Sequence, residues 1–211
     1  MEKLTDIRFR AALFDLDGVV LDTESQYSKF WGMMGREFVA DVPDFSQRIK
    51  GQTLVQIYDR WITDPDIQAE VTRRLNQFEA DMTFQYIRGA RAYIEVLRQR
   101  GILTAIVTSS NRPKMENVYR SRPELTQLFN RILTAEHFSE SKPSPQCYLR
   151  AAEALGVPTE ECVVFEDSIN GLKSGMASGA YVVGLATTLP REQIHPLCHL
   201  VINDFEDELL K

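Results

Sequence analysis

What the sequence lacks already excludes several classes of protein. The 211 residues contain no apolar run near the ~20 residues that span a bilayer, and the opening "MEKLTDIRFR" has no long apolar core of the signal-peptide kind. The net charge is −6, which gives no general attraction to nucleic acid or to an anionic membrane. We therefore expect a protein that binds neither nucleic acid nor membrane.

Cysteine is also scarce. Cys147, Cys162 and Cys198 are odd in number and widely spaced, which is typical of unpaired thiols in a reducing cytoplasm. Cys198 lies in "HPLCH", residues 195–199, but no second cluster of metal ligands matches it, so we expect no metal site there. Internal repeats and low-complexity segments are absent as well.

Short apolar segments alternate with longer amphipathic ones over most of the chain. This alternation predicts a parallel sheet with helical crossovers, an α/β fold. Strands are expected at residues 10–14, 101–110, 131–134, 161–168, 180–187 and 199–204, and helices at about 89–100, 111–120, 145–156 and 168–178.

One stretch interrupts this alternation. Residues 23–87 contain no convincing strand and read as several helices, with breaks at Asp41-Val42-Pro43, Gly51 and Asp64-Pro65. We expect a helical cap domain at 23–87, inserted into a sheet domain formed by 1–22 and 88–211, with hinges near 21–23 and 86–89.

Two acids end the first expected strand, in "FDLDG". Asp15 and Asp17 lie two residues apart, so extended backbone would point both carboxylates the same way, and the two like charges would repel. A plain Asp-Gly turn is one explanation. An EF-hand loop is not, because it would need oxygen ligands where Val19 and Leu21 stand. A Mg²⁺ site would relieve the repulsion, because Mg²⁺ binds one or two carboxylates together with phosphate oxygens.

The other strand ends carry polar groups of the same kind. Ligands bind beyond the carboxyl ends of parallel strands, so these groups are expected at one edge of the sheet. Glu166-Asp167 is a second half for the metal site or a helix cap, and Thr108-Ser109-Ser110 is a phosphate site or a helix cap. Lys142, which precedes Pro143, is a counter-charge for this edge or a solvated loop lysine.

Four segments in order across nearly the whole chain resemble motifs of the haloacid dehalogenase (HAD) superfamily: "DLDGVVLDTE", "VTSS", "SKPSPQCY" and "VVFEDSINGLKSG". The similarity is to members with a helical cap, in the β-phosphoglucomutase-like branch, which includes many sugar-phosphate phosphatases. It implies a Rossmann-like core and a helical cap that closes over the site to exclude water.

The resemblance also implies a role for each matching residue. Asp15 would be the nucleophile that forms an aspartyl-phosphate, and Asp17 the general acid and base. Mg²⁺ would be held by Asp15, the backbone carbonyl of Asp17, Asp167 and Glu166. Thr108 and Lys142 would bind the phosphoryl oxygens. Contacts to phosphate or substrate are expected from these two and from Leu16, Gly18, Ser109, Ser110 and Asn111, and a cap specificity loop from Lys50, Gly51 and Gln52.

Asp17 favours phosphate-ester chemistry, because the similar enzymes that cleave carbon–halogen bonds lack an aspartate there. The expected activity is hydrolysis of a small phosphorylated metabolite, and the resemblance implies that the protein works as a monomer. A phosphosugar mutase is the alternative, although the mutases have a histidine where Tyr27 stands and an arginine where Leu54 stands. A response-regulator receiver, which is much shorter, and a catalytically silent binding module are the alternatives outside enzyme chemistry.

Overall fold

The computed structural model describes residues 3–210, and the chain divides into two compact units. One unit runs to Asp22 and resumes at Phe84, and the other comprises Thr23–Thr83. Residues 84–87, which the sequence analysis placed in the cap, group with the first unit. We call the first the sheet unit and the second the helical unit.

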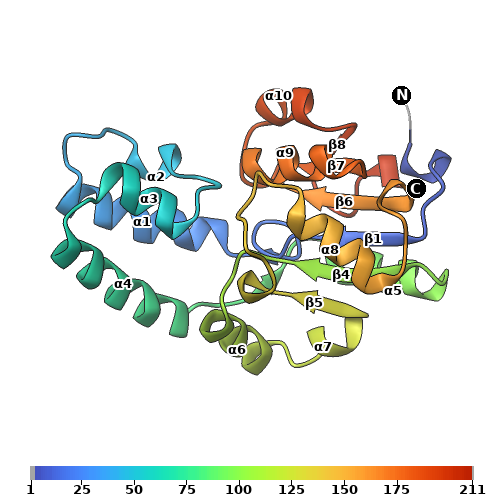
Figure 1. Ribbon diagram of the computed structural model, residues 1–211, viewed down its shortest axis with the longest axis horizontal. Coiled ribbons are helices and arrows are strands. Elements are labelled where there is room, and N and C mark those ends of the chain that lie inside the picture. Colours follow the sequence, from blue (N-terminus) through green and yellow to red (C-terminus); the bar gives the residue numbers. More distant parts are fainter. Residues whose placement is uncertain (1–2, 211) are drawn as a thin grey trace. The chain divides into compact units, whose positions relative to one another are not determined.

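The sheet unit contains a six-stranded parallel sheet (Figure 1). Its order is β5-β4-β1-β6-β7-β8, so β1 is central and successive strands are added outward on either side of it. The strands are β1 (Ala11–Phe14), β4 (Leu103–Val107), β5 (Arg131–Leu133), β6 (Cys162–Glu166), β7 (Tyr181–Leu185) and β8 (Leu200–Ile202). Each predicted strand is present, and the α/β, Rossmann-like fold class is confirmed.

Helices connect the strands as the crossovers of a parallel sheet require. They are α5 (Ala90–Gln99), α6 (Arg112–Ser121), α7 (Leu125–Leu128), α8 (Gln146–Leu155), α9 (Ile169–Ser178) and α10 (Arg191–Ile194). The short α7 and α10 were not predicted. The described residues also form 3₁₀ turns at Leu4–Asp6, Ala135–His137, Thr159–Glu161, His195–Leu197 and Glu208–Leu210.

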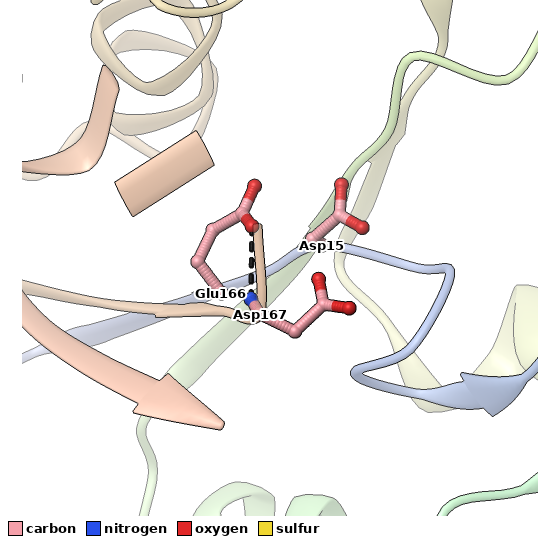
Figure 2. A group of neighbouring side chains, drawn as sticks. All are labelled: Asp15, Glu166 and Asp167. Carbon is pink, nitrogen blue, oxygen red and sulfur yellow. Dashed lines mark hydrogen bonds between the residues drawn. The ribbon is translucent and has the colours of Figure 1, made fainter. Parts of the chain in front are cut away.

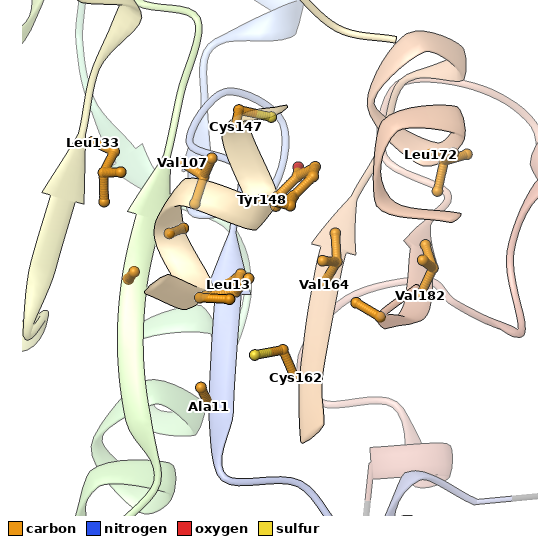
Figure 3. Close-up of a cluster of buried hydrophobic side chains, with 14 of the residues drawn as sticks. Ala11, Leu13, Val107, Leu133, Cys147, Tyr148, Cys162, Val164, Leu172 and Val182 are labelled. Atoms are coloured by element: carbon orange, nitrogen blue, oxygen red, sulfur yellow. The ribbon is translucent and has the colours of Figure 1, made fainter. Parts of the chain in front are cut away.

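Alternate residues of β1 face opposite sides of the sheet, because side chains alternate along a strand. Ala11 and Leu13 belong to a buried cluster with Tyr148 of α8 and Leu172 of α9 (Figure 3). Phe14, on the other face, stacks on Phe165 with ring centroids 4.6 Å apart. Both faces of the strand are therefore covered, which explains why all four of its residues are apolar.

The helical unit has a hydrophobic core of its own. Its helices are α1 (Glu24–Phe38), α2 (Phe45–Arg48), α3 (Leu54–Trp61) and α4 (Pro65–Ala80). Thr53 and Gln56 form a capping box at the start of α3, and the Asp64 carboxylate caps α4 ahead of Pro65. Phe30 of α1 stacks on Phe78 of α4, with centroids 4.9 Å apart. The buried residues of this core are Phe30, Trp31, Met34, Phe45, Ile49, Ile57, Ile62, Val71 and Leu75.

A two-stranded antiparallel ribbon lies where the chain leaves and re-enters the sheet unit. It pairs β2 (Leu21–Asp22) with β3 (Gln85–Tyr86), and the Ile87 N–H donates to the Val20 carbonyl. This pairing is why residues 84–87 group with the sheet unit. No helix within residues 3–210 is long and apolar enough to cross a membrane.

Candidate active site

The strand order brings the expected catalytic residues together. Since β1 lies between β4 and β6, the carboxyl ends of these three strands adjoin. Asp15 follows β1, Thr108 follows β4, and Glu166 is the last residue of β6. The chain is added outward in both directions from β1, and ligands of such sheets bind at this reversal point.

Lys142 is the buried hub of the site. Its ammonium donates to Asp15 Oδ1 at 2.7 Å, to Glu166 Oε1 at 2.6 Å and to the Val107 carbonyl at 3.3 Å. Burial lowers the pKa of Lys142, but the carboxylates of Asp15 and Glu166 outweigh it and hold that pKa well above its usual value. The ammonium is therefore charged, and its three donors each have an acceptor.

Asp15 is under opposing influences. Burial, and after it the neighbouring charges of Glu166 and Asp17, raise its pKa, while Lys142 lowers it; the result is a pKa of about 7. Without a further cation, the carboxyl group would thus be partly protonated near neutral pH. The site would hold an ionised Asp15 more readily if a metal ion added positive charge.

Three carboxylates here fit a metal ion. One oxygen from each of Asp15, Glu166 and Asp167 lies within 4.8 Å of the others, and Figure 2 shows the three side chains as neighbours. An all-oxygen, acidic donor set suits a hard divalent cation such as Mg²⁺. The residues present therefore fit the group that the sequence suggested.

The three carboxylates are not equally available. Glu166 Oε1 accepts from Lys142 and from Tyr148 Oη at 2.9 Å, and Oε2 accepts from Asp167 N–H and from the N–H and hydroxyl of Ser168. A carboxylate has about four acceptor positions, so Glu166 is saturated by protein donors. Asp15 and Asp167 are the better placed of the three for direct coordination.

Gly18 and two threonines support Asp167. Gly18 has φ +75°, and a Cβ there would lie 2.0 Å from Asp167 Oδ2, so the turn needs glycine for both conformation and space. The Thr188 hydroxyl donates to Asp167 Oδ2, and the Thr187 hydroxyl donates to the Gly18 carbonyl at 2.6 Å. The loop after β7 therefore fixes the orientation of a predicted metal ligand.

Asp17 has partners different from those of Asp15. Its Oδ2 accepts from Ser110 Oγ at 2.9 Å and from Lys114 Nζ at 2.7 Å. Lys114 belongs to the first turn of α6, and Ser110 to the loop that precedes this helix. The predicted nucleophile and the predicted acid–base residue are thus held by two separate lysines.

The other predicted contact residues occupy different surroundings. Thr108 is buried and its hydroxyl accepts from Ser110 N–H at 3.0 Å, whereas Ser109 is exposed. The Asn111 side chain caps α6 by accepting from Lys114 N–H. The Leu16 side chain is fully buried, so a contact with substrate would come from its backbone.

Lys50, Gly51 and Gln52 belong to the helical unit. The amide of Gln52 donates to the Arg48 carbonyl at 2.9 Å, and Gly51 has φ +73°. These contacts describe a local turn, and a role for the three residues in substrate recognition stays a prediction.

Comparison with known proteins now identifies the family. The profile of the haloacid dehalogenase-like hydrolases matches residues 9–179, which include every predicted site residue. The chain belongs to the haloacid dehalogenase-like hydrolases.

Relatives of this hydrolase include both phosphatases and mutases. It is 33% identical to hexitol phosphatase A of Escherichia coli (strain K12), over 85% of this chain and 84% of that protein. It is 31% identical to a β-phosphoglucomutase of Mycobacterium bovis (strain ATCC BAA-935 / AF2122/97), over 86% of this chain and 82% of that protein. A crystal structure of a HAD hydrolase, family IA, variant 3, from Entamoeba histolytica HM-1:IMSS has a TM-score of 0.81 at 25% identity, covering 93% and 94%.

Sequence reasoning missed several residues of the hydrolase site. Thr187 and Thr188 follow β7, and reading the end of that strand as closely as the earlier ones would have found them. Lys114 and Tyr148 gave no such signal, because each lies within a helix whose orientation depends on tertiary packing.

Proposed function

We propose that this hydrolase is a Mg²⁺-dependent phosphatase that acts on a small phosphoester through a phosphorylated Asp15. The observation that supports it best is the buried set of Asp15, Lys142 and Glu166 beside Asp167, at the strand ends where ligands of such sheets bind. A carboxylate nucleophile next to a fixed cation and a cation-binding acid suits phosphoryl transfer.

The proposed reaction has two halves. A carboxylate oxygen of Asp15 attacks phosphorus, the bond to the leaving oxygen breaks, and Asp17 gives that oxygen a proton. Asp17 then removes a proton from water as the water attacks the phosphoryl group, and the bond between phosphorus and the Asp15 oxygen breaks. Inorganic phosphate leaves, and Asp15 and Asp17 return to their starting states.

Mg²⁺, when bound by Asp15, Asp167 and the backbone carbonyl of Asp17, would neutralise charge on the phosphoryl oxygens. Lys142 fixes Asp15 and would contribute positive charge from the other side. Because Glu166 is saturated by donors from the protein, we assign it to holding Lys142 and the start of α9, with direct coordination requiring that it lose one of these bonds.

Water is the acceptor that we favour over a sugar hydroxyl. Tyr27 stands where the resemblance places a histidine in the mutases, and its hydroxyl donates to Glu79 Oε1 at 2.7 Å within the helical unit. This bond gives Tyr27 a local packing role. The names of the relatives suggest a sugar or polyol phosphate as the substrate class, and the mutase relative keeps conversion of β-glucose 1-phosphate as the second candidate.

The helical unit, in this proposal, is the cap that selects the leaving group, with Lys50, Gly51 and Gln52 as its specificity loop. We propose that the hydrolase works as a monomer in the cytoplasm on a small phosphorylated metabolite, without nucleic acid or membrane partners. The three cysteines are free thiols, in keeping with a reducing compartment.

A phosphoester panel tests this function. Purified protein with Mg²⁺ should release inorganic phosphate from at least one sugar or polyol phosphate, and Asp15→Asn should lose turnover altogether while keeping its fold by circular dichroism. A coupled assay that converts β-glucose 1-phosphate to glucose 6-phosphate tests the second candidate. Isomerisation without phosphate release would replace the phosphatase by the mutase.

A further inference from the structure

Lys114 is a buried lysine to which the proposed reaction gives no role. It is 5% exposed, although lysine is among the residues that are almost never fully buried without a partner. Its ammonium lies 2.7 Å from Asp17 Oδ2, across 97 positions of sequence. The contact therefore depends on the fold and joins α6 to the turn after β1.

The start of α6 explains how Lys114 reaches Asp17. Asn111 caps the helix through Lys114 N–H, which fixes the backbone of Lys114 in the first turn. Side chains on a helix lean toward its N-terminus, so that of Lys114 leans back toward the end of β4 and the site. Ser110, just before the cap, is carried to the same place.

The two donors hold one oxygen of Asp17. Ser110 Oγ and Lys114 Nζ both donate to Oδ2, and two donors on one oxygen restrict rotation of the carboxylate. Asp15 N–H still donates to the Phe165 carbonyl in line with the sheet, whereas Asp17 lies in the turn beyond β1.

The charges at this edge also favour a second lysine. Asp15, Asp17, Glu166 and Asp167 contribute four carboxylates, and Lys142 and Lys114 contribute two ammonium groups. When all six groups are ionised, the two ammonium groups leave two of the four negative charges unbalanced, and one divalent cation would balance these two.

We propose that Lys114 is a positioning residue that, with Ser110, holds the Asp17 carboxylate in line with the leaving oxygen of the phosphoester. This inference rests on the proposed phosphatase function and concerns the first half-reaction, in which Asp15 is phosphorylated. As the bond from phosphorus to the leaving oxygen breaks, the proton on Asp17 passes to that oxygen. A basic leaving group needs this proton, and a weakly basic one leaves with little help.

A comparison of kcat/KM for two aryl phosphates of similar shape distinguishes this positioning role of Lys114 from a loss of structure. Phenyl phosphate has a more basic leaving oxygen than p-nitrophenyl phosphate, and kcat/KM for each reports the steps up to phosphorylation of Asp15. Lys114→Met should lower kcat/KM for phenyl phosphate by about 100-fold, in the range of a lost general acid. For p-nitrophenyl phosphate the fall should be under about tenfold.

Three further variants control this comparison. Ser110→Ala removes the other donor to Oδ2 and should give a smaller loss with the same preference, which keeps the test available if Lys114→Met does not fold. Lys114→Arg keeps the charge and should recover part of the phenyl phosphate activity. Arg120→Met removes an exposed cation from the same helix and should leave both substrates unaffected.

Equal losses on both substrates in Lys114→Met would overturn the inference, because loss of phosphate binding or of folding acts on both alike. That result would leave the phosphatase itself standing. If the wild type released phosphate from neither aryl ester nor from any member of the panel, the proposed function would fail and this inference with it.

Discussion

The two units of the chain differ in where their ion pairs lie: those of the helical unit are on the surface, whereas the sheet unit also buries some of its own. In the helical unit, Arg74 pairs with Glu37 and Glu70, and Arg73 pairs with Glu70, all on partly or fully exposed surface. At the strand ends of the sheet unit, Lys142 and Lys114 pair with buried or partly buried acids, while other pairs of that unit, such as Arg91 with Glu95, are exposed.

The exposed and the buried ion pairs have different energetic consequences. Exposed pairs contribute little, because water already solvates their charges, whereas burying charge is costly unless every group is paired. A chain that needed stability alone would have apolar residues at the strand ends. The buried set is therefore better explained by chemistry than by stability.

Removal of Lys142 should have the largest effect on activity and stability, because it takes the cation out of the buried set. Lys142→Met leaves Asp15 and Glu166 without their shared cation, and we expect kcat to fall about 10³-fold, as when a preorganised donor is lost. The free energy of unfolding should fall by about 3 kcal/mol, the cost of breaking a buried pair. Phosphate release and urea denaturation measure the two effects. Near-normal turnover would contradict our view of the site.

Two helical glycines, one in each unit, give a second comparison between the buried site and the surface. A Cβ at Gly171 of α9 would lie 1.8 Å from Glu166 Oε1, whereas one at Gly32 of α1 would meet only the end of Arg36 at 3.7 Å. Gly171→Ala should therefore lower both activity and melting temperature. Gly32→Ala should stabilise by up to about 1 kcal/mol through helix propensity alone. A harmless alanine at position 171 would show that the Glu166 carboxylate moves easily.

Metal affinity should depend on pH because of Asp15. Burial and neighbouring acids raise its pKa to about 7, and a proton competes with the metal for the carboxylate. The apparent dissociation constant for Mg²⁺ should be about tenfold higher at pH 6 than at pH 8 and nearly constant above that. Titration calorimetry at both pH values measures it, with Asp15→Asn as the variant that removes this dependence.

The raised pKa of Asp15 also makes the stability of the folded protein depend on pH. Metal-free folded protein keeps the Asp15 proton up to a pKa of about 7, and the unfolded chain loses it near the ordinary aspartate pKa of 3.8. The folded state thus binds more protons between these values, so the contribution of Asp15 to stability falls as pH rises through this window. Melting curves in a chelator should show this fall, and added Mg²⁺ should reduce it.

The smallest effect is expected in the helical unit. Glu37→Gln removes one exposed partner of Arg74, which keeps Glu70. Turnover should not change, and the melting temperature should shift only slightly, and less in high salt than in low salt. A large loss of stability would mean that the contrast between the two units is one of degree.

The sequence allowed much of the sheet unit to be predicted, because its signals are local. Buried parallel strands are continuous apolar runs, and the polar residues that end them are adjacent in sequence. The ribbon of β2 and β3 was not foreseen, since it joins two-residue strands from distant positions. Those strands are too short to show a period.

The contacts within the site were less predictable than its members. Asp15, Asp17, Lys142, Glu166 and Asp167 were all expected there, but the sequence did not indicate which acid each cation holds. Lys114 could not be expected, because its role depends on the turn of α6 relative to β1. The saturation of Glu166 depends on five donor groups from four residues, and two of these, Lys142 and Tyr148, are brought to it only by the fold.

The ribbon of β2 and β3 has a consequence for how this hydrolase can change over time. Leu21 pairs with Tyr86 and Asp22 with Gln85, so the two ends of the helical insertion are already side by side at the sheet unit. To the sheet, the whole insertion is equivalent to a closed hairpin. Evolution or an engineer can therefore lengthen, shorten or exchange the inserted module while the acids and lysines at the strand ends keep their register.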